Sequence, residues 1–259
     1  MRKVLLVLGI AILCLPMLFV TWLLLASRWQ KMDPTTAHAP LFLRQAVASV
    51  ILQKTTYGKE SLPRIDRILR LDPQNAEAWQ RRCSASAWGK SPNLKDCETA
   101  VKFAGGPGDY YNLGHIEEAT GDPCTAEDNY TEAVSKTSAN PDTDYLEAMG
   151  RSALLCNHLP ASRAGYEVAA TTQQKWLNQS DLDQDEIDDA KKNLLADQES
   201  LIVIYHRQHD DLLAGQTCTA AHPNWKVCSC DIDTKGAASC TEAKPATPPA
   251  STHPHSAAP

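Results

Sequence analysis

Four cysteines near the C-terminal end have the residue type and spacing that could support chemistry. Cys218, Cys228, Cys230 and Cys240 have nine, one and nine residues between them, in a segment rich in Thr, Gly, Pro and Asn. Such a cluster forms two structural disulfides, holds zinc through four thiolates, or exchanges disulfides through the closely spaced Cys228 and Cys230. The sequence favours structural disulfides, because zinc sites more often have two-residue gaps, and it leaves zinc and redox exchange open.

The rest of the chain contains no pattern typical of a catalytic centre. Gly-rich phosphate loops, His-Glu-x-x-His motifs and nucleophile elbows are missing from the sequence. His115 falls near Glu117 and Glu118 on one predicted helix, but a lone histidine beside carboxylates is usually a surface residue. We therefore expect a protein that is not an enzyme and that has no cofactor and no metal ion. The net charge of −6 argues against a nucleic-acid partner.

Residues 109–133 predict two helices folded against each other. Selected residues recur every three or four positions, as they do on the buried face of a helix. These are Tyr110, Leu113, Gly114 and Glu117 on the first helix, and Ala126, Tyr130 and Ala133 on the second. Gly121 and Asp122 break the chain between them, and Pro123 suits the first turn of the second helix. Gly114 and Ala126 are small enough to let the helices touch closely.

The same pattern returns along the chain. Adding 36 residues takes Gly114 to Gly150, Tyr130 to Tyr166 and Ala133 to Ala169, and a weaker upstream copy has Trp79, Cys83, Cys97 and Ala100. The pattern resembles the tetratricopeptide repeat, which has a large residue, Leu-Gly, a Gly turn, and then Ala, an aromatic residue and Ala. The resemblance predicts repeats at about 41–75, 76–107, 108–141 and 142–174.

The resemblance implies an all-α solenoid of helical hairpins, whose first helices line a concave groove for a protein or peptide partner. The groove-facing positions lie one turn off the buried face; they are Gln80, Ser84, Trp88, Tyr111, His115, Glu118, Glu147 and Arg151. Gln80 and Tyr111 occupy positions where versions of the family that grip a terminal carboxylate need lysine. We therefore expect the partner to be held in another way.

Two disulfides are expected between the predicted helices of these repeats. Cys124 opens the second helix of one repeat and Cys156 closes the first helix of the next, and antiparallel packing brings a start beside an end. Cys83 and Cys97 lie on the two helices of a single repeat, at the positions of Gly114 and Tyr130. The alternative is four buried free thiols, since cysteine packs well as a small apolar residue.

Residues 1–31 predict a short cytoplasmic end and a membrane anchor. Residues 4–26 are uncharged and almost wholly apolar, and at 1.5 Å per residue they reach about 34 Å, enough for a hydrocarbon core of roughly 30 Å. A cleaved signal peptide usually has an apolar core of only about 7–15 residues. We expect a single uncleaved span of the inner, cytoplasmic membrane, in contact with the lipid bilayer. Eight of the nine cysteines follow it, which favours a C-terminal domain on the periplasmic or extracytoplasmic side.

The remaining segments read as accessories to the repeats. Residues 32–40 are a linker. Residues 180–215 predict one long helix or two broken pieces that cap the repeats, with a capping signature at Asp183 and Glu186. Residues 216–242 predict a small cysteine-rich module without helix. Residues 243–259, rich in Pro, Ala and His, predict a disordered tail.

The sequence as a whole predicts a membrane-anchored repeat scaffold that binds a protein partner, by analogy in cell-envelope protein assembly or complex formation. The alternative is a thiol-redox or metal-handling protein that acts through Cys218, Cys228, Cys230 and Cys240.

Overall fold

The computed structural model describes residues 40–55, 61–89, 91–137, 142–179 and 181–243. It contains two compact units that meet in sequence between Ile116 and Glu117, and each is described by itself. The predicted anchor at residues 4–26, the linker up to residue 39 and the tail from residue 244 lie outside the described residues. No helix within the described ranges is long and apolar enough to cross a membrane.

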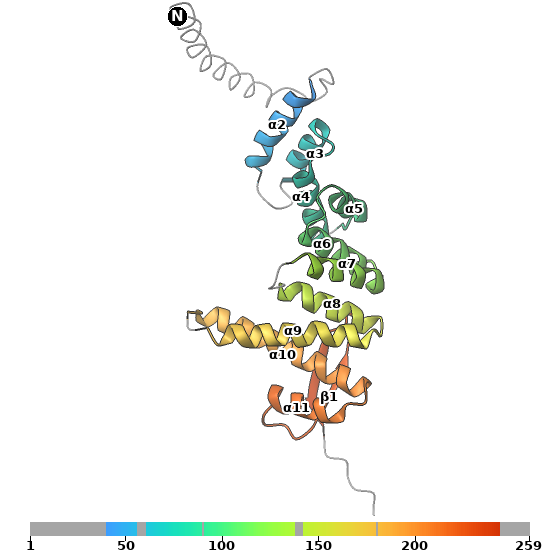
Figure 1. Ribbon diagram of the computed structural model, residues 1–259, viewed down its shortest axis with the longest axis vertical. Helices are drawn as coiled ribbons and strands as arrows, with labels where there is room; N and C mark the ends of the chain where they lie inside the picture. The colour runs from blue at the N-terminus through green and yellow to red at the C-terminus, as the bar shows by residue number, and fades with distance from the viewer. Residues whose placement is uncertain (1–39, 56–60, 90, 138–141, 180, 244–259) are drawn as a thin grey trace, which may run out of the picture. The chain divides into compact units, whose positions relative to one another are not determined.

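The described residues are mostly helical, with one two-stranded sheet. The first unit holds α2 (Leu41–Gln53), α3 (Leu62–Leu71), α4 (Ala76–Ala87), α5 (Leu94–Phe103) and most of α6 (Pro107–Ala119), drawn in blue to green in Figure 1. Consecutive helices pack on one another, α2 on α3, α3 on α4 and α4 on α5. Two helices fall within each of the first two predicted repeats.

The second unit begins near the end of α6 and contains five further helices and a hairpin. These are α7 (Pro123–Lys136), α8 (Thr143–Leu155), α9 (Leu159–Leu177), α10 (Gln184–Arg207), α11 (Asp211–Ala221), β1 (Cys228–Ile232) and β2 (Ala238–Glu242). The strands are antiparallel, with Cys230 opposite Cys240. Consecutive helices from α7 to α11 pack together, and both strands pack on α10. Figure 1 shows the strands, in dark orange, beside α10.

Short polar side chains fix where the helices begin. The Asn75 side chain accepts a hydrogen bond from the Ala78 amide at the start of α4, at 3.0 Å. The predicted capping signature before α10 is confirmed: Asp183 accepts from the Glu186 amide while the Glu186 carboxylate accepts from the Asp183 amide. These bonds satisfy amides that have no partner inside the helix.

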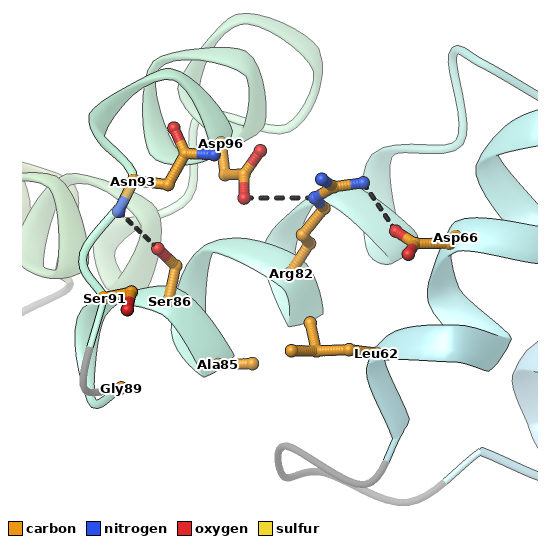
Figure 2. A pocket seen from close by; sticks show the side chains of 9 residues that line it. All are labelled: Leu62, Asp66, Arg82, Ala85, Ser86, Gly89, Ser91, Asn93 and Asp96. Atoms are coloured by element: carbon orange, nitrogen blue, oxygen red, sulfur yellow. Dashed lines mark hydrogen bonds and ion pairs between the residues drawn. The ribbon is translucent and has the colours of Figure 1, made fainter.

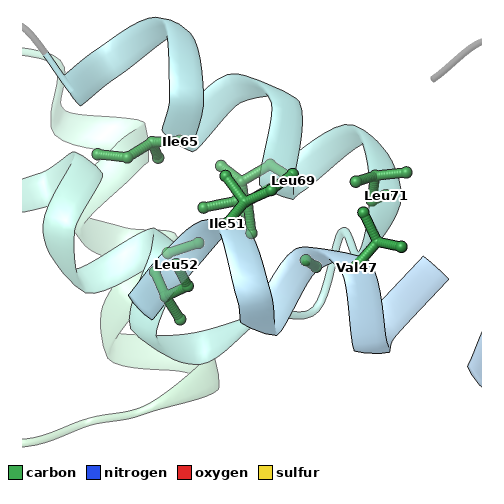
Figure 3. Packing of buried hydrophobic residues seen from close by; sticks show 9 residues of the cluster. Val47, Ile51, Leu52, Ile65, Leu69 and Leu71 are labelled. Carbon is green, nitrogen blue, oxygen red and sulfur yellow. The ribbon is translucent and has the colours of Figure 1, made fainter. Parts of the chain in front are cut away.

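The core of the first unit consists of two apolar clusters. The first joins α2 and α3 through Val47, Ala48, Ile51, Leu52, Ile65, Ile68, Leu69 and Leu71, with Ala78 from α4 (Figure 3). The second joins α4, α5 and α6 around Cys83 and Cys97, with Leu113 and Ile116. Every helix of this unit therefore buries one face against its neighbours, which stabilises short helices that are marginal alone.

Two glycines bring α8 and α9 into close contact in the second unit. A Cβ atom on Gly150 would lie 2.9 Å from the Tyr166 ring, and one on Gly165 would lie 2.9 Å from the Leu146 carbonyl oxygen. Gly150 and Tyr166 are the counterparts of Gly114 and Tyr130 in the predicted repeat, and Tyr130 is also fully buried. Small residues at these positions thus permit the helix contact that the sequence pattern predicts.

The C-terminal part of the second unit differs from its prediction. The segment over residues 180–215, expected as one long helix or two broken pieces, is two helices, because His209 adopts a positive φ and Asp210 caps a new helix by accepting from the Leu213 amide. The module expected without helix at residues 216–242 starts inside α11, which carries Cys218, and ends as a β-hairpin.

Candidate functional site

The first unit brings three of the expected partner-binding side chains together. Trp88, at the end of α4, stacks on His115 of α6 with ring centroids 4.3 Å apart, and its centroid lies 6.3 Å from that of Tyr111. Trp88 is 57% exposed, so this aromatic cluster reaches the surface. A stacked, water-facing set of rings offers apolar area with little conformational entropy to lose on binding.

Hydrogen bonds hold the aromatic cluster in place and engage the polar side chains next to it. The Trp88 ring nitrogen donates to the Asn112 side-chain oxygen at 3.1 Å. Gln80, also expected to face a partner, donates instead to the buried Asp109 carboxylate at 2.9 Å. Ser84 lies half-buried on α4. Trp88, Tyr111 and His115 therefore form the candidate surface, and Gln80 helps to hold it.

In the second unit, Glu118 and Arg151, both expected to face a partner, are hydrogen-bonded to each other. Arg151 donates two hydrogen bonds to Glu118, from Nε at 2.7 Å and from Nη2 at 2.9 Å. The buried Tyr130 hydroxyl donates to the same carboxylate at 2.9 Å. The Glu118 hydrogen bond raises the pKa of Arg151. The two charges thus join α6, α7 and α8 within the unit.

The β-hairpin covers the same part of α8. Gly236, in the turn between the strands, sits so close that a Cβ atom on it would lie 2.6 Å from Arg151 Cγ and 3.2 Å from Leu155 Cγ. The Arg151 charge is thus paired with Glu118 and its stem lies under the turn, and its place in a partner-binding groove stays a prediction.

Glu147, the last of the expected groove residues, lies half-buried on α8 rather than open to solvent. Burial raises the pKa of its carboxyl, helped by the nearby Asp144 charge, and a hydrogen bond with Gln173 opposes the shift. Its neighbour Asp197 on α10, which the sequence did not single out, is 1% exposed. The Glu147 charge acts on Asp197, so this region of α8 and α10 is an acidic interior.

All eight cysteines of the described residues form disulfides. The two predicted pairs are confirmed, with Cα atoms 4.5 Å apart in Cys83–Cys97 and 5.5 Å apart in Cys124–Cys156. The C-terminal cluster forms two disulfides, Cys218–Cys228 and Cys230–Cys240, in agreement with the structural disulfides that the sequence favours. A zinc site of four thiolates is incompatible with these bridges.

A surface pocket of about 410 Å³ lies among α3, α4 and α5, and the sequence did not reveal it (Figure 2). Arg82 spans it, with Nη1 2.6 Å from Asp66 and Nε 3.0 Å from Asp96. The Ser86 hydroxyl accepts from the Asn93 amide at its far side, at 2.6 Å. Because Arg82 is engaged by both carboxylates, the pocket is a polar junction between helices, and we assign it no ligand.

Comparison with protein-family models and with curated proteins finds no match for this chain.

Proposed function

We propose that this protein is a membrane-tethered scaffold of the tetratricopeptide-repeat type, and that it binds a segment of a partner protein on the aromatic cluster of α4 and α6. The repeat assignment draws its support from paired helices in the predicted segments and from the close contact at Gly150 and Gly165. The tether is the apolar run at residues 4–26.

One observation carries the binding proposal, namely the exposed stack of Trp88 and His115 beside Tyr111. Trp88 is 57% exposed, so a partner that covers its ring would gain the free energy of burying that apolar surface. Aromatic residues are also enriched among the side chains that dominate binding energy at protein interfaces. The neighbouring Gln80 and Asn112 have hydrogen bonds within the unit, so the rings are held ready in one arrangement.

A photo-crosslinking residue at position 88 tests this proposal in the cell. We expect p-benzoylphenylalanine at Trp88 to capture one protein reproducibly in membranes. The same substitution at Trp176 of α9, which is 44% exposed, is the matched control. It should not capture the protein that is crosslinked at position 88.

The captured protein, once purified, is then titrated against the full chain. Trp88→Ala should weaken binding about tenfold or more, a loss of at least ~1.4 kcal/mol, with unchanged helical circular dichroism. Equal affinity of the Trp88→Ala and Trp176→Ala variants would contradict the proposal.

A further inference from the structure

The C-terminal module gathers three side chains of the kinds that bind metal ions. Glu199 lies on α10, His222 follows the last residue of α11, and Cys240 lies on β2. Each side chain offers one ligand atom, which is a carboxylate oxygen in Glu199, a ring nitrogen in His222 and the sulfur in Cys240. These three atoms all lie within 4.8 Å of one another. No other set of three His, Cys, Asp or Glu side chains in the described ranges converges in this way.

The histidine and the glutamate are held in place by the surrounding structure. His222 Nε2 lies 3.0 Å from Glu199 Oε1, and the two side chains are 14% and 16% exposed. The His222 ring also stacks on Trp225, with centroids 3.7 Å apart and planes 10° from parallel. Both groups are therefore positioned before any ligand arrives, which lowers the entropy lost on binding.

The third residue, Cys240, places a second sulfur atom at the site, that of its disulfide partner. Cys240 is bonded to Cys230, which stands directly opposite on β1 with a Cα separation of 4.0 Å. The start of β1 is tied to α11 by the separate Cys218–Cys228 disulfide. If the Cys230–Cys240 bond is broken, strand pairing and the second bridge still hold both sulfurs beside His222 and Glu199.

We propose that reduction of the Cys230–Cys240 disulfide turns this module into a zinc site with Cys230, Cys240, His222 and Glu199 as its ligands. A dithiol reductant supplies two electrons and two protons to the bond and becomes a disulfide itself. The two thiols of the protein then release their protons as Zn²⁺ binds their sulfurs. The ring nitrogen of His222 and an oxygen of Glu199 donate lone pairs to the same ion.

The ligand set and its spacing suit zinc better than a hard cation. Two thiolates and an imidazole are ligands of Zn²⁺, whereas Mg²⁺ and Ca²⁺ take oxygen. A tetrahedral ion with Zn–S near 2.3 Å and Zn–N or Zn–O near 2.0 Å places two sulfurs roughly 3.8 Å apart and the N and O atoms roughly 3.3 Å apart. The 3.0 Å separation of His222 and Glu199 is already close to that value. This site lies in the second unit and does not depend on the aromatic cluster of the first.

Metal titration of the full chain in both redox states tests the proposal. The chain is reduced with a phosphine, exchanged without oxygen, and titrated with Co²⁺ and then Zn²⁺, while alkylation and mass spectrometry identify the free thiols. We expect the reduced chain to bind one Zn²⁺, to show the thiolate charge-transfer absorption of tetrahedral Co²⁺, and to have Cys230 and Cys240 protected from alkylation by zinc. The oxidised chain should bind none at the same concentration.

Variants assign the ligands. Glu199→Gln and His222→Asn keep both C-terminal disulfides for folding, and each should weaken zinc binding by at least about tenfold in the reduced state. The pair Cys230→Ser and Cys240→Ser should remove the absorption altogether.

A control pair separates this site from other cysteines. Joint replacement of Cys124 and Cys156 by serine should leave the one-ion stoichiometry intact. The proposal is overturned if the 230–240 bond resists reduction while the fold persists, if the reduced chain binds no zinc, or if zinc is lost with the control pair and kept in Glu199→Gln and His222→Asn.

Discussion

Asp197 is an acid enclosed by the second unit, and its ionisation opposes folding. The residue is 1% exposed, and its Oδ2 atom has no hydrogen-bond partner among the described residues. Burial, together with the Glu147 charge from α8, raises the pKa of Asp197 to about 8. From α9, the Tyr166 hydroxyl also faces this group, and burial raises its pKa to about 12, so it stays neutral. Asp197 is therefore protonated in the folded protein at neutral pH.

This raised pKa predicts that stability falls as the pH rises. Below pH 3.8, the pKa of an unperturbed aspartate, Asp197 is protonated in both the folded and the unfolded chain, and its contribution to the free energy of unfolding is fully present. As the pH rises from there to the folded-state pKa of about 8, the unfolded chain loses the proton first, so this contribution is lost. The slope is at most about 1.4 kcal/mol per pH unit for one proton. Urea unfolding of the full chain at several pH values measures it.

Asp197→Asn removes the titrating group while keeping its shape. We expect the variant to flatten this slope, and to gain stability over the wild type as the pH rises from 5 to 8. Asp189→Asn, on an exposed position of the same helix, is the control and should follow the wild type. A slope that survives in Asp197→Asn would show that another group, such as Glu147, causes it.

At the scale of the element, the contact between α8 and α9 depends on the absence of side chains. A Cβ atom on Gly165 would meet the Leu146 carbonyl oxygen at 2.9 Å and Gly150 Cα at 3.2 Å, and backbone atoms cannot swing aside. Gly215 of α11 offers the opposite case, because nothing lies within 4 Å of the Cβ position there.

Substitution by alanine should therefore have opposite signs at these two positions. Gly165→Ala forces the helices apart and should destabilise the chain by about 1–3 kcal/mol. Gly215→Ala restricts the unfolded chain and raises helix propensity, so it should stabilise by about 0.5–1 kcal/mol. Chemical denaturation of the oxidised chain measures both. If Gly165→Ala stabilises the chain as Gly215→Ala does, α8 and α9 do not touch as closely as described.

Helices and their closest contacts could be predicted from the sequence, because they depend on local rules. The spacing around Gly150 and Tyr166 and the cap at Asp183 each depend on residues within one or two helical turns of each other. The Cys124–Cys156 bridge also followed, since antiparallel neighbours bring a helix start beside a helix end.

Contacts between distant segments could not be predicted in this way. Glu199, His222 and Cys240 come from three elements with no shared periodicity, so no spacing relates them. The covering of Arg151 by the Gly236 turn depends on where a hairpin docks. Asp197 was not singled out from the sequence, although it lies three residues after Leu194 and four before Leu201 and the structure buries it.

At the scale of the whole molecule, the pairing of all eight described cysteines supports our proposal that this part of the chain lies outside the cytoplasm. Reporter fusions at residue 40 test the topology. We expect a reporter that needs an oxidising compartment to be active and a cytoplasmic reporter to be silent. Fusions active only in the cytoplasm would refute both the orientation and the role assigned to residues 4–26.

The order of the disulfides also bears on how the chain matures. Taken in chain order, the eight cysteines pair consecutively, first with second, third with fourth and so on, as 83–97, 124–156, 218–228 and 230–240, so no bridge encloses or crosses another. If the part of the chain after the anchor enters an oxidising space in sequence order, the correct partner of each unpaired thiol is the next cysteine of the eight to emerge. An oxidant that joins thiols in order of arrival gives the native set directly, without an isomerase to reshuffle it.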